Sequence, residues 1–432
     1  MAPPADHPQV PAERLISRTI QSTWILYVIG GLYIAGPVLG WTLAFLAARA
    51  LYLAPGLPEQ DRPQRPGRVV LLWMVGMLAM LIVLLVGHAT NGLGIGQTIK
   101  SATGWAKGWA LLALFPFAGA VLEIRPSVIY RATCRLGLQT LILLPLFLIA
   151  PRIGLPAQLY VSPLQILGGS GPEYFSVVLY TLDPEFHIAR WQFFAPWSPA
   201  AGMVAVVYIL CAIEERDWGW KAAGIASGLA LALFSQSRLA LVAIAVIWPL
   251  AQLVARANKP ALWFGFAPGA LVAGFFATDI QNAIGEVMDR FKGARVDSSR
   301  VRAALGRIAV SRWQSEAPWV GHGIVERGPH MVEYMPIGSH HTWYGLLFVK
   351  GALGALSLAV PMLYSLVSLA WHASRAPIVR VGFSMLLVLF LYSFGENLEV
   401  LGYLYWPALI LIGCSARAIG LDVARCETVR SA

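Results

Sequence analysis

Long apolar segments separated by short polar ones run along most of this chain. Ten of them approach the roughly 20 residues that an α-helix needs to cross a bilayer. They lie at about 69–87, 102–123, 136–154, 197–214, 222–236, 238–255, 261–279, 343–368, 381–395 and 399–415. This alternation predicts ten membrane-spanning helices.

The first apolar stretch, residues 22–53, has a different length. It is too long for one untilted span and too short for two full ones. Pro37 and Gly40 lie near its middle, so we expect a hairpin of two short helices that turns there. The predicted fold class is therefore all-α, a polytopic membrane protein of about 12 transmembrane helices.

Composition agrees with a chain that has the bilayer as its solvent. Apolar residues make up 57% of the 432 residues and charged residues 12%, and the mean hydropathy is +0.65, far above what a soluble domain of this length needs. The net charge of +10 does not indicate nucleic acid, because the basic residues fall mostly between the apolar segments. The first twenty residues are polar and show no signal-peptide pattern, so we expect the amino terminus to stay in the cytoplasm.

The positive-inside rule gives the topology. With the amino terminus inside, each short cytoplasmic segment contains Lys or Arg: 1–21, 54–68, 124–135, 215–221, 256–260, 371–380 and the carboxyl-terminal tail. The two longest polar segments then share the external face. The second of them is itself basic, but long loops cross largely regardless of charge.

The predicted organisation follows from this topology in seven parts. They are a cytoplasmic tail (1–21), N-terminal transmembrane helices (22–154), a first periplasmic loop (155–196), central transmembrane helices (197–279), a large periplasmic loop with an amphipathic helix (280–342), C-terminal transmembrane helices (343–415) and a cytoplasmic tail (416–432). Both termini are expected in the cytoplasm, and the protein in a bacterial inner membrane.

The large loop contains the pattern of an amphipathic helix. Asp297, Ser298 and Ser299 supply an N-cap, apolar residues follow at helical spacing, and Arg300 and Arg307 share the opposite face. We expect this helix to lie on the membrane with its arginines outward. For most arginines on such a face, contact with solvent or lipid headgroups is the simpler explanation.

Arg238 lies in Ser235-Gln236-Ser237-Arg238, a tight turn between two apolar segments. Its guanidinium must point into an external vestibule or extend to lipid headgroups. A guanidinium is always charged and presents a planar fork to phosphate oxygens, which suits a diphosphate. Both interpretations remain open from the residues alone.

His340 and His341 end the large loop just before the span that begins at Trp343. A neutral histidine accepts a proton near neutral pH, so either ring could act as a general base on a hydroxyl. The four cysteines, Cys134, Cys211, Cys414 and Cys426, have no paired spacing. We therefore expect no disulfide, no metal site and no cofactor.

Several short motifs together resemble one family. They are Ser235-Gln236-Ser237-Arg238-Leu239-Ala240, Arg312-Trp313, Pro318-Trp319-Val320-Gly321-His322-Gly323, and Ser339-His340-His341-Thr342-Trp343-Tyr344-Gly345-Leu346-Leu347 with Gly351 and Gly354. In residues, order and spacing they resemble the O-antigen ligase and polymerase superfamily, from about Ala189 to the carboxyl end. Before Ala189 the resemblance is one of topology.

The resemblance implies a GT-C-like membrane glycosyltransferase, and the lack of a His-Glu-x-x-His or paired-aspartate motif favours a metal-independent mechanism. Such an enzyme takes a glycan from an undecaprenyl-diphosphate carrier at the periplasmic face and places it on a sugar hydroxyl. His340 matches the family's histidine and is implied as the base. His341 stands where the family usually has Asn or Ser, which leaves open which ring acts.

The resemblance also implies the residues that bind the diphosphate. Arg238 matches the arginine of the family's Ser-Arg motif, and Arg190 resembles the second arginine. Arg312 and Arg300 are further candidates. Arginines that neutralise a diphosphate leaving group and a base for the acceptor would suffice for the chemistry.

Three functions are compatible with these residues. The favoured one is polymerisation of surface polysaccharide repeat units, with a lipid-linked oligosaccharide as donor and a glycan as acceptor. The first alternative is a ligase that transfers the glycan to lipid A-core. The second is a transporter or flippase, which is disfavoured because inverted-repeat symmetry is not evident. Membrane lipids are expected partners and nucleic acid is not.

Overall fold

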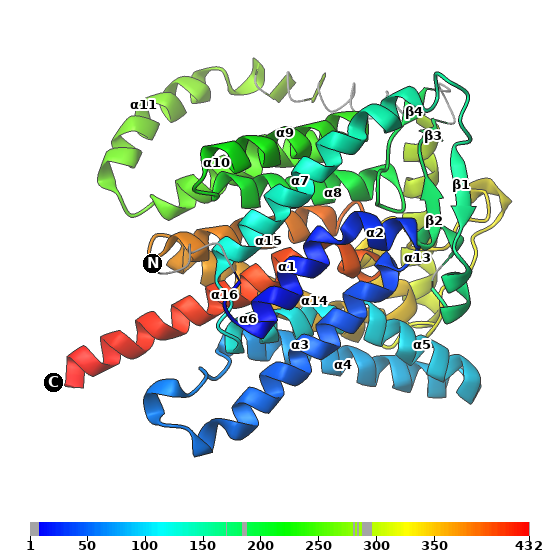
Figure 1. Ribbon diagram of the computed structural model, residues 1–432. Coiled ribbons are helices and arrows are strands. Elements are labelled where there is room, and N and C mark those ends of the chain that lie inside the picture. The colour runs from blue at the N-terminus through cyan, green and yellow to red at the C-terminus, as the bar shows by residue number, and fades with distance from the viewer. Residues whose placement is uncertain are drawn as a thin grey trace.

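A computed structural model describes residues 8–169, 171–183, 188–279, 281–282, 285–286 and 296–431. Its helices form a bundle with two distinct ends (Figure 1). One end holds the carboxyl-terminal part of α16 and the loop between α3 and α4. The other holds the strands β1 to β4 and helix α13. The two long loops predicted from the sequence therefore lie at the same end of the bundle.

Among the described residues, seven helical segments are long and apolar enough to span a bilayer, so the chain is a polytopic helical membrane protein. They are α3 (Leu32–Leu53), α4 (Arg68–Thr90), α5 and α6 together (Ile95–Lys107 and Leu111–Val121), α7 (Pro126–Ile149), α10 (Arg238–Ala255), α14 (Thr342–His372) and α16 (Leu398–Ser431). Shorter helices are α8 (Ser198–Ile213), α9 (Trp218–Phe234), α11 (Pro260–Phe275) and α15 (Pro377–Tyr392). Each of the ten predicted apolar segments thus overlaps a helix. The twelve membrane crossings expected from the sequence are more than the seven long apolar helices found among the described residues.

The chain does not turn at Pro37 in the first apolar stretch, so the expected position of the hairpin is wrong. The break falls between α2 (Thr23–Val28) and α3, where Gly30 has φ +72°, and α3 continues through Pro37. Ser162 of the first long loop donates a hydrogen bond to the Ile29 carbonyl (2.8 Å). A Cβ on Gly30 would lie 2.2 Å from the Ser162 Cβ. Glycine is needed here both for its backbone angle and for this close approach.

The predicted amino-terminal tail contains a helix that packs in the bundle. Helix α1 (Pro11–Gln21) packs against α7 with Ala12, Ile16 and Ile20 buried. The buried Glu13 carboxylate pairs with Arg125 (2.7 Å) and accepts the Gln9 backbone N–H (2.8 Å). A buried carboxylate needs such partners. The short 3₁₀ helices η1 (Ala54–Gly56) and η2 (Glu59–Asp61) follow α3.

The first long loop contains strands that the sequence pattern did not predict. β1 (Gln158–Val161) pairs antiparallel with β2 (Ser176–Val178), and β3 (Thr181–Leu182) pairs antiparallel with β4 (Ala189–Arg190). Two 3₁₀ helices, η3 (Pro163–Leu167) and η4 (Pro172–Tyr174), lie between β1 and β2. The Tyr27 hydroxyl donates to the Val178 carbonyl (3.0 Å) and accepts the Val178 N–H (2.7 Å). These bonds fix the loop on the helix bundle.

The second long loop contains the predicted helix, α13 (Val296–Glu316), followed by η5 (His330–Val332). Residues 280, 283–284 and 287–295 of this loop lie outside the described residues. Asp297 to Ser299 belong to the helix and do not precede it. Its apolar face does not meet lipid as expected: Val301, Ala304, Leu305 and Ala309 pack against Val332, Ile337, Phe348 and Val349. Helix α13 is therefore held against α14 by a small hydrophobic core of its own.

Helix α14 is broken at Gly351, which has φ +62°. The segment Pro318–Gly323 fills the break. His322 and Gly323 N–H groups donate to the carbonyls of Phe348 and Val349 (both 2.9 Å), and the Pro318 carbonyl accepts the Ala352 N–H (2.9 Å). Irregular backbone inside a membrane protein is tolerated where its polar groups are satisfied in this way. The motif around His322 thus anchors the second loop to α14, and with it the residues at the start of α14.

Candidate active site

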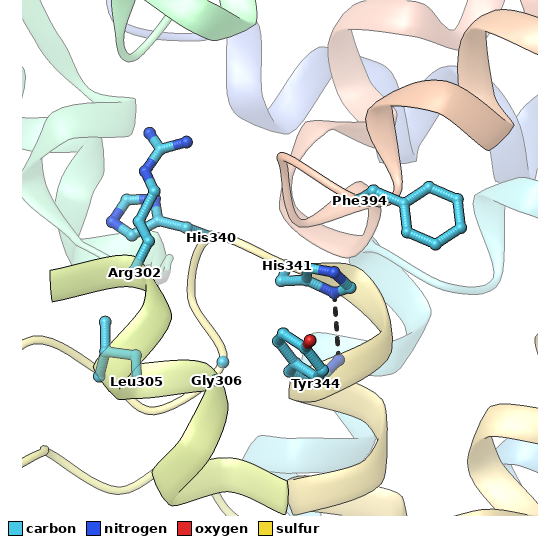
Figure 2. A pocket seen from close by; sticks show the side chains of 8 residues that line it. Arg302, Leu305, Gly306, His340, His341, Tyr344 and Phe394 are labelled. Atoms are coloured by element: carbon cyan, nitrogen blue, oxygen red, sulfur yellow. Dashed lines mark hydrogen bonds between the residues drawn. The ribbon is translucent and has the colours of Figure 1, made fainter. Parts of the chain in front are cut away.

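A cavity of about 80 Å³ lies where the start of α14 meets α13 and the turn after α15. Figure 2 shows the side chains that line it: Arg302, Leu305, Gly306, Gly338, His340, His341, Tyr344 and Phe394. Both histidines predicted from the sequence are among them. The cavity is at the strand-bearing end of the bundle.

The His341 side chain caps the N-terminus of helix α14. Its Nδ1 accepts the backbone N–H of Tyr344 (3.3 Å), which makes it the N-cap. The ring also stacks on the Tyr344 ring, with centroids 3.9 Å apart and planes 22° apart. Because Nδ1 is an acceptor, the proton of the neutral ring is on Nε2, and burial lowers the pKa of His341 to about 4. His341 therefore has a structural task that explains its presence.

The His340 ring has no such task. Within the part of the chain that the structure describes, it makes no hydrogen bond, and it lies beside Arg302 at the edge of the cavity (Figure 2). Burial and the charge of Arg302 lower the pKa of His340 to about 4. The ring is neutral at pH 7 with a lone pair available for a proton. This geometry favours His340 over His341 as a base.

Arg302 is the cationic residue of the cavity, and the sequence analysis did not select it. Its side chain is exposed, and in the described residues no acidic side chain pairs with its guanidinium. Gly306, one turn later, lets α13 approach α14 closely, since a Cβ there would lie 2.7 Å from the Tyr344 ring. A glycine inside a helical pattern marks such an approach. Gly306 is therefore the sequence feature that indicates the position of Arg302. Arg302 lies four residues earlier on the same face of α13, and this face packs near the loop that contains His340.

Arg312 has a different setting from the one expected. Its guanidinium pairs with Glu316 (2.8 Å) and with Glu326, and it lies 5.1 Å from the centre of the Phe348 ring. These hydrogen bonds raise the pKa of Arg312. Glu316 also accepts a hydrogen bond from His322 Nε2 (2.8 Å). Arg312 thus joins α13 to the following loop and does not line the cavity.

Arg300 does not line the cavity either. Its side chain is exposed on α13, and the cavity is formed by the residues that follow Val301 on this helix. Diphosphate binding by Arg300 and Arg312 stays a prediction from the sequence.

Arg190 and Arg238 come together at one turn. Arg190, in β4, donates from Nη2 to the Ser235 carbonyl (3.2 Å), and its Nη1 is 3.6 Å from the Asp183 carboxylate. Arg238 is half-buried at the first position of α10. The next residue, Leu239, approaches the turn that ends with Glu396, because a Cβ on Gly395 would lie 3.3 Å from Leu239 Cδ2. This turn also contains Phe394, which lines the cavity, whereas Arg190 and Arg238 are not among the lining residues.

Glu396 is a buried acidic residue two positions after Phe394, which lines the cavity. It is 2% exposed, and its Oε2 accepts the indole N–H of Trp197 (2.8 Å). Its main-chain carbonyl accepts the Thr342 hydroxyl (2.7 Å) and N–H (3.1 Å). Burial raises the pKa of Glu396 to about 7, against the opposing effects of Arg302 and the Trp197 bond.

This end of the membrane bundle holds a neutral imidazole, a buried carboxyl and a guanidinium that pairs with no acidic side chain of the described residues. The described residues contain no group of three His, Cys, Asp or Glu side chains placed to hold a metal ion. In comparisons with known proteins, no family model matches the chain. A search of curated proteins gives no match either.

Proposed function

We propose that this protein is a membrane glycosyltransferase that transfers an undecaprenyl-diphosphate-linked glycan to a sugar hydroxyl, polymerising repeat units of a surface polysaccharide. The main support is the juxtaposition of His340 and Arg302 in one cavity. A neutral base for a hydroxyl lies next to a cation for an anionic leaving group. The resemblance of the motifs around Arg238, His322 and His340 to the O-antigen ligase and polymerase superfamily points in the same direction.

The chemistry needs one proton acceptor and charge neutralisation. The oxygen of the acceptor hydroxyl forms a bond to the anomeric carbon of the donor while His340 takes the proton of that hydroxyl. The bond from that carbon to the diphosphate oxygen breaks, and the electron pair leaves with the diphosphate. Arg302, together with Arg238 and Arg190 as the arginines of the matched motifs, stabilises the added charge. The cavity volume of about 80 Å³ is too small for an oligosaccharide, so the reacting groups meet in it and the glycan extends outside.

The proposal places the strand-bearing end outside the cytoplasm of a bacterial inner membrane. Cysteines at the exposed positions Ile166 and Met331 should then react with an impermeant maleimide in intact cells. A cysteine at the exposed Leu57, at the opposite end, should react after permeabilisation. Background labelling is measured on the parent chain, whose Cys134, Cys211 and Cys414 are buried. The reverse labelling pattern would contradict this orientation.

The activity itself can be measured with purified protein in lipid nanodiscs. Given a polyprenyl-diphosphate-linked oligosaccharide alone, the wild type should produce glycans of twice and three times the repeat length, together with free polyprenyl diphosphate. A ligase would instead need added lipid A-core before the diphosphate is released. Movement of the intact donor between leaflets, without release of diphosphate under either condition, would identify a transporter.

A further inference from the structure

The imidazole ring of His322 lies between two hydrogen-bond acceptors. Its Nδ1 is 2.9 Å from the main-chain carbonyl oxygen of Phe348 in α14, and its Nε2 is 2.8 Å from a carboxylate oxygen of Glu316, the last residue of α13. The hydrogen bonds from Arg312 and from His322 lower the pKa of Glu316 to about 2, so this carboxylate, like a carbonyl, can only accept. Both ring nitrogens therefore donate, and in this geometry His322 is an imidazolium ion.

The carbonyl that His322 binds is one that the break in α14 sets free. In an unbroken helix the Phe348 carbonyl would accept the N–H of Ala352, but that N–H donates to Pro318. The backbone N–H and the Nδ1 of His322 take its place, each at 2.9 Å. The His322 side chain is 9% exposed, and a charged donor makes such a bond stronger. The imidazolium thus links the end of α13 to the break in α14.

The histidine on the other side of this segment needs no second proton. His88 of α4 contacts the next residue of the segment, because its Nε2 is 2.9 Å from the Gly323 carbonyl oxygen. Its Nδ1 is 3.1 Å from the hydroxyl of Thr98. A hydroxyl can donate as well as accept, so a neutral ring satisfies both contacts of His88. Of these two histidines, only His322 requires both protons.

The ion pairs of Arg312 decide what the His322 proton controls. Arg312 pairs with Glu316 and also with Glu326 of the following loop. It therefore continues to hold Glu316 when His322 is neutral. Lys350 of α14 is the charged residue just beyond the freed carbonyl, and its ammonium group lies 5.6 Å from the centre of an indole ring. The part of the contact that depends on the His322 proton is thus the link between α13 and α14.

We propose that the imidazolium form of His322 is a positioning group that fixes α13, and with it Arg302, against α14, and that loss of one ring proton loosens α13. Helix α13 is continuous, so a contact at its end also holds its earlier turns. Those turns carry the cavity-lining residues Arg302, Leu305 and Gly306. The contact itself is independent of the proposed function, whereas its effect on glycan transfer rests on it.

The two acceptors also fix the direction of the pH effect. The contact stabilises α13 while the ring holds both protons, and this stabilisation is lost as rising pH removes one of them. The alkaline side of the kcat/KM profile should then report His322, and the acid side the base His340. We expect a loss of about three- to tenfold on the alkaline side, the effect of one charge-assisted hydrogen bond reduced by solvent screening. The screening applies because Glu316 is half-exposed.

The test follows the ring and the helix separately, across the pH range in which histidines ordinarily titrate and above it. Nitrogen NMR of histidine-labelled protein in lipid nanodiscs shows whether both ring nitrogens of His322 carry protons. Its signals are assigned by their absence in His322→Gln. Hydrogen exchange of the carboxyl-terminal part of α13, corrected for the intrinsic rate, shows how firmly the helix is held. Both transitions should have the same midpoint, with exchange about three- to tenfold faster on the alkaline side.

Variants separate the partners of this contact. A glutamine at position 316 can donate or accept, so a neutral His322 ring is satisfied and Glu316→Gln should remove the pH dependence. This substitution is at a half-exposed side chain and gives a readout even if His322→Gln does not fold. His330→Gln is the matched control, because His330 is exposed in the same loop, and it should keep the dependence. His88→Gln should keep it as well.

The outcomes distinguish the contact from the proposed function. The proposal is overturned by a His322 ring that is neutral throughout the range, by exchange that is constant in the wild type, or by a pH dependence that persists in Glu316→Gln. Loss of the dependence in His88→Gln would assign the proton to His88 and also overturn it. An alkaline loss of transfer that persists in Glu316→Gln overturns the effect on the cavity. Absence of transfer at every pH, in a protein whose ring and helix still titrate together, supports the contact and removes the proposed function.

Discussion

His340→Ala is expected to lower the rate of glycan transfer by roughly 10²- to 10⁴-fold while the lipid-linked donor still binds. The reason is that the variant keeps the arginines proposed to bind the diphosphate and loses the group proposed to take the acceptor's proton. Donor binding is measured with a polyprenyl-diphosphoryl-N-acetylglucosamine probe. Glycan transfer is measured with the purified protein in lipid nanodiscs. A variant that loses binding and transfer in parallel would show that His340 is not the base.

The pH profile gives a second signature of the same base. Burial and the charge of Arg302 hold the pKa of His340 at about 4 in the free protein. A base must be unprotonated, so the value of kcat/KM should fall on the acid side near pH 4 and not near the ordinary histidine value of about 6.5.

His341→Asn is the matched control for His340→Ala. Asparagine is a good N-cap and preserves the bond to the Tyr344 N–H, while the ring that stacks on Tyr344 is lost. This variant should keep transfer within a few-fold and lose some thermal stability. Strong loss of transfer in His341→Asn together with an active His340→Ala would mean that His341 is the catalytic ring.

The helices could be predicted from the sequence because lipid imposes a simple rule on it. Every span must be an apolar run of sufficient length, and the runs at 69–87 and 343–368 match α4 and α14 well. The break of α14 at Gly351 could not be predicted from the length of apolar runs. It depends on hydrogen bonds from Pro318–Gly323, a segment about thirty residues earlier, which a local pattern does not contain.

The strands of the first long loop were missed for a related reason. β3 and β4 have two residues each, too few for an alternating pattern to be recognised. Their formation brings Arg190 to the Ser235 carbonyl. The proximity of Arg190 to the turn at Arg238 was therefore an expectation from the motif resemblance and could not come from the spacing of the residues.

At the site, both predicted histidines line the cavity, and their contacts differ, while their catalytic roles stay predictions. The N-cap bond of His341 requires the backbone conformation at the start of α14, which no motif specifies. The two arginines of α13 that the sequence analysis selected do not line the cavity. Arg300 and Arg312 were selected by charge and by their place near a motif, whereas access to the cavity depends on the face of α13 that Gly306 brings against Tyr344.

Arg302→Ala is expected to lower kcat/KM for the lipid-linked donor by roughly 10²-fold or more, as for other groups that stabilise a developing anion. Arg302→Lys should recover little of this, because an ammonium ion cannot replace a planar fork that binds two phosphate oxygens. Arg307→Ala on the same helix is the matched control, since Arg307 is also exposed but does not line the cavity. The transfer assay at low donor concentration reports all three variants. If Arg302→Lys has nearly wild-type activity, Arg302 contributes only a positive charge and not a bidentate contact. If Arg302→Ala and Arg307→Ala lose equal activity, α13 attracts the donor by its overall charge, and the cavity is not where the diphosphate binds.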